Sequence, residues 1–141
     1  MALPRTFIAA TLTAHVLVLT AAATAGQQPT TSDGWQLPAT AATEVNPLPV
    51  TPALLAKGKD LFKSKCQRCH GPAGKGNGPD AEPDHSPGDL TDAKRASRNP
   101  DGVLFYKIWN GRSKPKMPAL KADISRDEVW TLVHYIKTLR Q

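Results

Sequence analysis

Residues 66–70 read CQRCH and hold both cysteines of the chain, with a histidine directly after the second. Two thiols at this spacing suit four kinds of site: a disulfide, a redox-active dithiol, part of a metal site, or a pair of thioether bonds to a haem. Each kind of site makes different demands on the rest of the chain. The remaining sequence therefore decides between them.

The first 25 residues have the features of a secretory signal peptide. Arg5 is their only Lys, Arg, Asp or Glu residue, residues 6–25 are mainly apolar or small, and residues 23–25 read ATA, which fits an A-x-A cleavage site. An uncleaved membrane anchor stays open as an alternative, because the apolar run approaches spanning length. Export predicts a periplasmic or otherwise oxidising location, in which thiols rarely stay free.

Residues 26–50 predict an extended linker or strap. This segment is rich in Pro, Thr, Ala and Gln, and Asp33 and Glu44 are its only charged residues. Trp35 is the exception to this polar composition. A single aromatic side chain in such a segment is expected to fold onto the neighbouring domain as an anchor.

The remainder, residues 51–141, predicts one all-α domain with three main helices and long loops, because Pro and Gly are frequent and strand-like alternation is missing. The first helix should begin at Pro52 with Thr51 as its N-cap. Gly58 lies in the middle of that helix, where glycine costs about 1 kcal/mol relative to alanine. We therefore expect another helix to cross closely at this point.

The second helix is predicted from Asn99 as N-cap to a stop at residues 110–111, which read NG. The third is predicted from Ser125, with Glu128 completing a capping box. The buried stripe of the third helix is expected at Val129, Leu132, Val133, Ile136 and Leu139. Residues 71–100, rich in Gly, Pro and Asp, are expected to form a long irregular loop between the first two helices.

A covalent haem accounts for both the motif and the long loops. In C-x-x-C-H the thiols of Cys66 and Cys69 add to the two vinyl groups, and His70 coordinates the iron from one face. The chain lacks the βαβ pattern of a dithiol enzyme, and a disulfide closing so short a loop contributes little stability. A zinc site would need two histidines from His70, His85 and His134. Haem is therefore favoured, as a single haem c that fills the core.

Met117 is the predicted sixth ligand of the iron. It is the one methionine after the leader, and it lies in an irregular basic stretch between Pro115 and Pro118. Filling a gap in the core is the alternative role for a single methionine. His85 is a competing ligand, whereas His134 should lie off the buried stripe and face water.

Four stretches, CQRCHGPAGKGNGP, GKDLFKSKC, KPKMPAL and EVWTLVHYIKTL, resemble the monohaem class I c-type cytochromes of bacteria over residues 52–140. The resemblance implies a cytochrome c fold for the domain of residues 51–141. It also implies that the carbonyl of Pro79 accepts a hydrogen bond from the ring of His70. Near the haem, it implies that the first and last helices cross at Gly58, Phe62 and Tyr135.

Ligation by His70 and Met117 leaves no open position on the iron, so the predicted function is one-electron transfer rather than enzymatic catalysis. The resemblance places such a carrier in an exported respiratory or dehydrogenase chain. The alternatives are a haem enzyme or gas sensor with a labile sixth ligand, and a fixed cytochrome subunit of a larger oxidoreductase complex. Membrane contact is expected only through partner complexes or an uncleaved leader.

The formal net charge of +6 predicts how partners are recognised. Basic side chains cluster in or near the second helix and the segment around Met117: Lys94, Arg95, Arg98, Lys107, Arg112, Lys114, Lys116 and Lys121. Clustered charge of one sign steers a partner of the opposite sign. We therefore expect redox partner proteins with acidic docking surfaces, and export disfavours nucleic acid as a partner.

Overall fold

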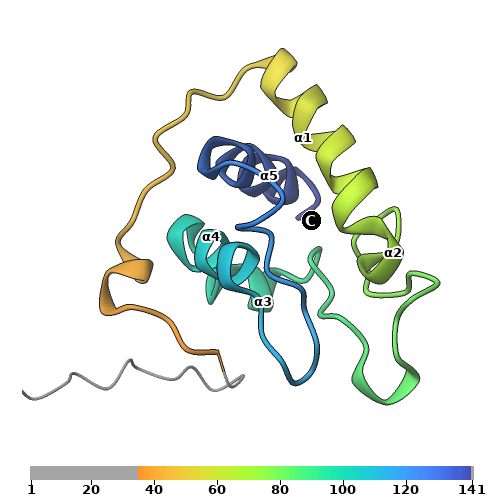
Figure 1. The fold of residues 1–141 in the computed structure, drawn as a ribbon. Helices are drawn as coiled ribbons and strands as arrows, with labels where there is room; N and C mark the ends of the chain where they lie inside the picture. Colours follow the sequence, from red (N-terminus) through yellow and green to blue (C-terminus); the bar gives the residue numbers. More distant parts are fainter. Residues whose placement is uncertain (1–34, 141) are drawn as a thin grey trace, which may run out of the picture.

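The structure is a computed structural model that describes residues 35–140 (Figure 1). The predicted signal peptide and the first part of residues 26–50 lie outside the described residues. The described part is all-α and contains no β-strand, which confirms the predicted class. Its elements are the 3-10 helices η1 (Ala39–Ala42) and η2 (Pro83–His85) and the α-helices α1 (Pro52–Lys65), α2 (Gln67–His70), α3 (Ala93–Ser97), α4 (Asp101–Asn110) and α5 (Arg126–Thr138).

The ends of α1 and α5 follow local capping signals. The Thr51 side chain accepts a hydrogen bond from the backbone N–H of Leu54 at 3.1 Å. At the start of α5, Ser125 Oγ accepts from the N–H of Glu128 at 3.2 Å, and the Glu128 carboxylate accepts from the N–H of Ser125 at 3.0 Å. Each bond satisfies a donor that the first turn leaves without an intrahelical partner. Both predicted starts are confirmed.

The predicted cap of α4 is wrong. Pro100 occupies the cap position and Asn99 makes no capping bond. Instead, the Asn99 side chain donates to the carbonyl of Arg95 at the end of α3 and accepts a hydrogen bond from Lys107 Nζ at 2.7 Å. The amide is therefore already engaged in joining α3 to α4. The predicted stop is confirmed, since Gly111 ends α4 at a φ of 59°.

The segment of residues 71–100 is also more ordered than predicted, because it contains η2 and α3. Asp92 caps α3, and its carboxylate accepts from the N–H of Arg95 at 2.9 Å. The glycines and prolines around it hid this signal in the sequence.

Helices α1 and α5 pack against each other (Figure 1). They approach closely at Gly58, as expected. A Cβ atom on Gly58 would lie 2.7 Å from Tyr135 Cβ and 3.0 Å from the carbonyl oxygen of Thr131. Such a contact is too short for any side chain, so glycine is required here despite its cost in a helix. One turn further on, the rings of Phe62 and Tyr135 lie 5.4 Å apart. The predicted contact between these helices is confirmed.

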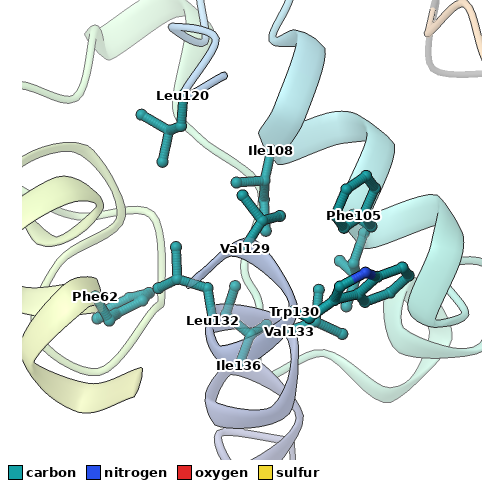
Figure 2. Close-up of a cluster of buried hydrophobic side chains, with 10 residues drawn as sticks. Phe62, Phe105, Ile108, Leu120, Val129, Trp130, Leu132, Val133 and Ile136 are labelled. Atoms are coloured by element: carbon teal, nitrogen blue, oxygen red, sulfur yellow. The ribbon is translucent and has the colours of Figure 1, made fainter. Parts of the chain in front are cut away.

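The core lies between α1, α4 and α5, and Figure 2 shows its side chains converging from these helices. Phe105 of α4 is fully buried and stacks on Trp130 of α5 at 4.2 Å between ring centres. The most buried residues of the core are Phe62, Phe105, Val129, Leu132 and Val133. Within the described part of the chain, none of the helices has the length and apolar character that crossing a membrane requires.

Residues 35–50, named the strap from here on, wrap around the outside of α4 and α5 (Figure 1). Trp35 is 7% exposed and packs with Leu37, Ala41 and Val103, so the expected anchor is confirmed. A Cβ atom on Gly102 would lie 2.4 Å from the carbonyl oxygen of Ala41. This glycine lets the strap approach the start of α4 closely.

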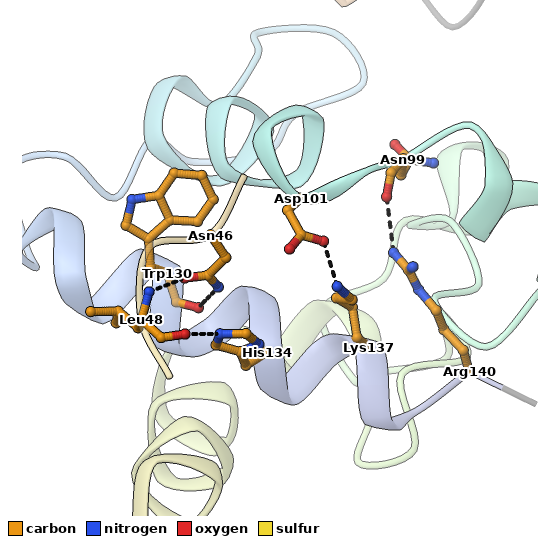
Figure 3. Close-up of polar contacts among 8 residues, drawn as sticks. All are labelled: Asn46, Leu48, Asn99, Asp101, Trp130, His134, Lys137 and Arg140. Carbon is orange, nitrogen blue, oxygen red and sulfur yellow. Dashed lines mark hydrogen bonds and ion pairs between the residues drawn. The ribbon is translucent and has the colours of Figure 1, made fainter. Parts of the chain in front are cut away.

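The strap also corrects the expectation for His134. Its Nε2 atom lies 2.9 Å from the carbonyl oxygen of Leu48, and the residue is partly buried (Figure 3). Beside it, the Asn46 side chain donates to the Trp130 carbonyl at 2.8 Å. Helical periodicity placed His134 off the buried stripe but did not reveal that the strap covers this side of α5.

Candidate haem site

The cysteine motif forms a short helical turn at the end of α1. The N–H of Cys66 donates to the carbonyl of Phe62, and the N–H of His70 donates to the carbonyl of Cys66, both at 2.9 Å. Gly71 then ends α2 at a φ of 75°, which is in the left-handed region. The motif is thus held by the helix that precedes it.

The loop after the motif folds back onto α2. The N–H of Gly78 donates to the carbonyl of Cys69 at 3.1 Å, and the N–H of Asp80 donates to that of Arg68 at 2.8 Å. The Arg68 guanidinium donates two hydrogen bonds to the Asp80 carboxylate, of 2.7 and 2.9 Å. Because Gly78 and Asp80 both bond to α2, Pro79 between them in the sequence lies next to this helix.

A cavity of about 180 Å³ brings the predicted site residues together. Cys66, Cys69 and His70 line it from the end of α1 and from α2, and Met117 lines it from the loop after α4. The apolar part of its wall comes mainly from α1, α4, α5 and the loops: Phe62, Leu90, Leu104, Ile108, Leu120 and Ile136. Pro79 is exposed and does not line the cavity.

The two thiols are not bonded to each other. Burial raises the pKa of the Cys66 thiol to about 12, and the neighbouring Cys69 thiol acts in the same direction. A redox-active dithiol needs a thiol whose pKa is lowered, because the thiolate is the nucleophile. The environment of Cys66 therefore disfavours a dithiol enzyme.

His70 is suited to bind a metal through a neutral ring. Burial lowers the pKa of its imidazole, the backbone of Gly88 acts against that shift, and the positive charge of Arg95 lowers the pKa further. The ring is thus neutral at neutral pH, and a neutral ring nitrogen has a lone pair to donate. Its Nδ1 atom is buried without a hydrogen-bond partner among the described residues.

Met117 is held by a small backbone bridge. The N–H of Arg112 donates to the Met117 carbonyl at 2.8 Å, and the N–H of Met117 donates to the Arg112 carbonyl at 2.9 Å. Both ends of the segment that carries Met117 are therefore tied together directly after α4. This arrangement presents the side chain to the cavity from the wall formed by α4 and the strap.

These residues fit a c-type haem. Two thiols, one ring nitrogen and one thioether lie around a single cavity whose wall is largely apolar, as a flat apolar prosthetic group with an iron centre requires. A zinc site fits less well. In residues 35–140, no group of three or more His, Cys, Asp or Glu side chains is placed to hold a metal ion. His85 also lines the cavity, so it remains the competing ligand.

Half of the predicted basic cluster reaches the cavity: Arg95, Lys107, Arg112 and Lys116 line it, whereas Lys94, Arg98, Lys114 and Lys121 do not. The wall residues that the sequence did not assign to the site include Trp35, Lys65, Asn99 and Arg140. They come from the strap, the end of α1, the start of α4 and the chain end. Their common location depends on the tertiary fold, and no local motif marks it.

The fold and this site define a c-type haem protein: an all-α chain around a cavity lined by a C-x-x-C-H motif. Residues 55–140 match the Cytochrome c family, so the chain belongs to that family, as a class I c-type cytochrome. Membership implies covalently bound haem c and supports haem-based electron transfer. Among curated proteins the comparison found no match.

Nine chains of solved structures match this chain, and two of them illustrate the similarity. One is a chain of the Kuenenia stuttgartiensis reducing HAO-like protein complex Kustc0457/Kustc0458, with 30% identity and a TM-score of 0.56 over 70% of this chain. The present chain spans 50% of the length of that one. The other is the KustC0563 c-type cytochrome, with 25% identity and a TM-score of 0.52, covering 60% of this chain and 98% of the other.

Proposed function

We propose that the protein is a one-electron carrier with a single haem c, attached through Cys66 and Cys69 and ligated by His70 and Met117. The observation that carries the proposal is the cavity, because it brings these four side chains together from two segments of the chain. When bound, the haem supplies a ferric/ferrous couple that exchanges one electron at a time. The protein chain itself would supply the ligands of the iron and the surface that meets redox partners.

The two proposed ligands, His70 and Met117, make different contributions. His70 offers a neutral ring nitrogen on one side, and Met117 offers a soft thioether that favours the ferrous state. If His70 and Met117 both held the iron, no position would be left for a substrate, so the group would serve electron transfer rather than catalysis. The Nδ1 atom of His70 has no hydrogen-bond partner among the described residues, and we propose the Pro79 carbonyl as its acceptor in the haem-loaded protein.

The setting we propose is an exported respiratory or dehydrogenase chain. Features that support export are the leader-like composition of residues 1–25 and the cytochrome c family itself. A fixed subunit of a larger oxidoreductase complex is the second candidate, because one similar structure is a chain of a protein complex. Membrane contact would then arise through partners or through an uncleaved leader.

Optical spectra of the haem-loaded protein, oxidised and reduced, test the carrier function. We expect a six-coordinate ferrous form whose spectrum does not change when carbon monoxide is added, because Met117 occupies the sixth position. Rapid carbon monoxide binding to the wild-type protein would contradict this proposal. It would instead favour a haem enzyme or gas sensor with a labile sixth ligand.

Partner docking is assigned to the basic residues around the cavity. Six cationic side chains line it: Lys65, Arg95, Lys107, Arg112, Lys116 and Arg140. The described residues of the wall include no Asp or Glu. A surface of one sign near the redox centre would steer an acidic partner and hold it only briefly, as a shuttle requires.

Reversing the charge of two exposed lysines beside the cavity is expected to slow association with an acidic redox partner. The Lys114→Glu, Lys116→Glu variant should lose about tenfold in association rate at low salt, because steering contributes ten- to a thousandfold. Stopped-flow electron transfer at several ionic strengths measures this rate. The difference should shrink as the screening length falls from about 10 Å at 0.1 M towards 3 Å at 1 M.

The matched control is Lys59→Glu, Lys63→Glu on α1, since both lysines are exposed and neither lines the cavity. Arg112 and Lys57 are left unchanged, because Arg112 packs on Trp35 and Lys57 pairs with Glu128 at 3.3 Å. Equal losses in both variants would leave net charge as the only cause. No salt dependence in either would point to a fixed subunit.

A further inference from the structure

We infer that Trp35 is a positioning residue for the Met117 loop, which comprises residues 112–117, and that it acts through Arg112. The inference rests on the proposed function, since it concerns how the thioether of Met117 is kept in place. It assigns a task to the strap, which lies outside the residues that match the Cytochrome c family.

Trp35 belongs to two parts of the molecule at once. Its side chain lies in a small apolar cluster with Leu37, Ala41 and Val103, and Met117 packs against this cluster. The same side chain lines the cavity that holds the predicted haem ligands. Trp35 therefore forms the piece of wall that connects the strap to the segment carrying Met117.

Arg112 links the Trp35 ring to the Met117 loop. The Arg112 guanidinium carbon lies 4.3 Å from the centre of the ring, within the range of a cation–π contact. Nε of the same side chain donates to the carbonyl of Pro115 at 3.0 Å. Its backbone exchanges two hydrogen bonds with Met117, of 2.8 and 2.9 Å. One residue thus contacts the ring, the middle of the loop and the proposed ligand.

A second cation fixes the ring against α4. Lys107 Nζ lies 5.1 Å from the centre of the Trp35 ring, and the same ammonium donates to Asn99 at 2.7 Å. Cation–π contacts contribute more where the ring is withdrawn from water, and Trp35 is 7% exposed. The ring is therefore held between the rigid helix α4 and the loop that follows it.

The strap itself has several attachments of its own. The Glu44 carbonyl accepts a hydrogen bond from the N–H of Gly102 at 3.1 Å, and Asn46 and Leu48 bond to α5 (Figure 3). None of these strap residues lines the cavity. They give Trp35 a fixed base that does not depend on the Met117 loop.

The loop needs this support because much of it lies at the surface. Lys114 and Lys116 are exposed, and the backbone bridge ties only the two ends of the loop together. A surface segment with few buried contacts opens locally at low free-energy cost. An opening of the loop would move Met117 away from the cavity. Contacts to a buried ring raise the cost of that opening.

Replacing Trp35 with leucine in the full haem-loaded chain tests the inference. Loss of both cation–π contacts should make amide hydrogen exchange at Arg112 and Met117 about tenfold faster. The reduced variant should also bind carbon monoxide, and its reduction potential should fall, because the thioether leaves the iron more often. Trp35→Phe should restore most of the protection, since a phenyl ring keeps a face for the cations.

Leu37→Ala is the matched control. Leu37 is 4% exposed and lies in the same cluster, but it does not line the cavity. It should lower the free energy of unfolding while leaving the potential and the carbon monoxide response unchanged. If Leu37→Ala changed these two readouts as Trp35→Leu does, cluster stability alone would be the cause and the inference would be wrong. Unchanged exchange at Arg112 and Met117 in Trp35→Leu would overturn it as well.

Arg112→Gln keeps the test decisive if Trp35→Leu does not fold. It removes the cation above the ring and should speed exchange at Met117 to a similar extent, and an unchanged rate would refute the proposed link. Hydrogen exchange also separates this inference from the proposed function. If Met117 is not the ligand, Met117→Ala leaves the haem spectrum unchanged, whereas exchange at residue 112 still reports whether Trp35 holds the loop.

Discussion

Replacing Cys66 and Cys69 together with alanine is expected to abolish covalent haem attachment and to prevent the chain from reaching its native fold. The core helices surround a cavity of about 180 Å³, and their inner residues would have to pack around it without the prosthetic group. The apolar surface of the wall would then meet water instead of the prosthetic group, at a cost of about 25 cal/mol per Å². Since small domains are stable by only about 5 to 15 kcal/mol, this loss removes much of the total.

Extraction with acidified acetone and circular dichroism measure the two effects. The wild-type protein should keep its haem through denaturation and extraction, because thioether bonds persist where coordination bonds break. A single Cys69→Ala variant is the control, since one thioether bond through Cys66 should still retain the haem. Complete extraction of haem from the wild-type protein would show that the motif does not form thioether bonds.

The main helices could be predicted from the sequence because their signals are local. Thr51 and the pair Ser125 and Glu128 form bonds within one helical turn, so residue type and spacing are sufficient to identify them. Gly58 was informative for another reason. Glycine in the middle of a helix is unfavourable by itself, so its presence indicated a close neighbour, and the structure identifies that neighbour as Tyr135.

Features that depend on distant neighbours could not be predicted. Asn99 looked like a helix cap, but its amide bonds to Arg95 and Lys107 instead. His134 was expected to face water because periodicity describes a single helix and cannot include a strap that covers it. In both cases the local pattern was correctly identified, and a contact from elsewhere in the chain determined the outcome.

The candidate site likewise combines features that local sequence predicts with features that depend on distant contacts. The C-x-x-C-H motif, the leader and the missing βαβ pattern together pointed to haem, whereas the gathering of Met117 and Trp35 at one cavity depends on how α4 and the strap pack. Pro79 lies beside α2 but outside the cavity wall, and its hydrogen bond to His70 stays a prediction. The ligand role of Met117 also stays a prediction, which one further experiment can decide.

Replacing Met117 with alanine is expected to open the sixth position of the iron while leaving the haem attached and the helices intact. The reduced variant should bind carbon monoxide, which the wild type should not, and its reduction potential should be lower, because a thioether ligand raises it. Optical spectra with and without the gas, together with circular dichroism, measure these changes. The fold should persist because Met117 lies outside the most buried part of the core.

Met117→Leu separates ligation from packing. Leucine nearly preserves the side-chain volume, and swaps of this kind usually cost less than about 1.5 kcal/mol, yet leucine has no sulfur to donate. It should therefore bind carbon monoxide as the alanine variant does while remaining close to the wild type in stability. Spectra that stay the same in both variants would remove Met117 as the ligand. His85 would then be the candidate, because it lines the same cavity, and His85→Ala should in that case produce the opening that the Met117 variants did not.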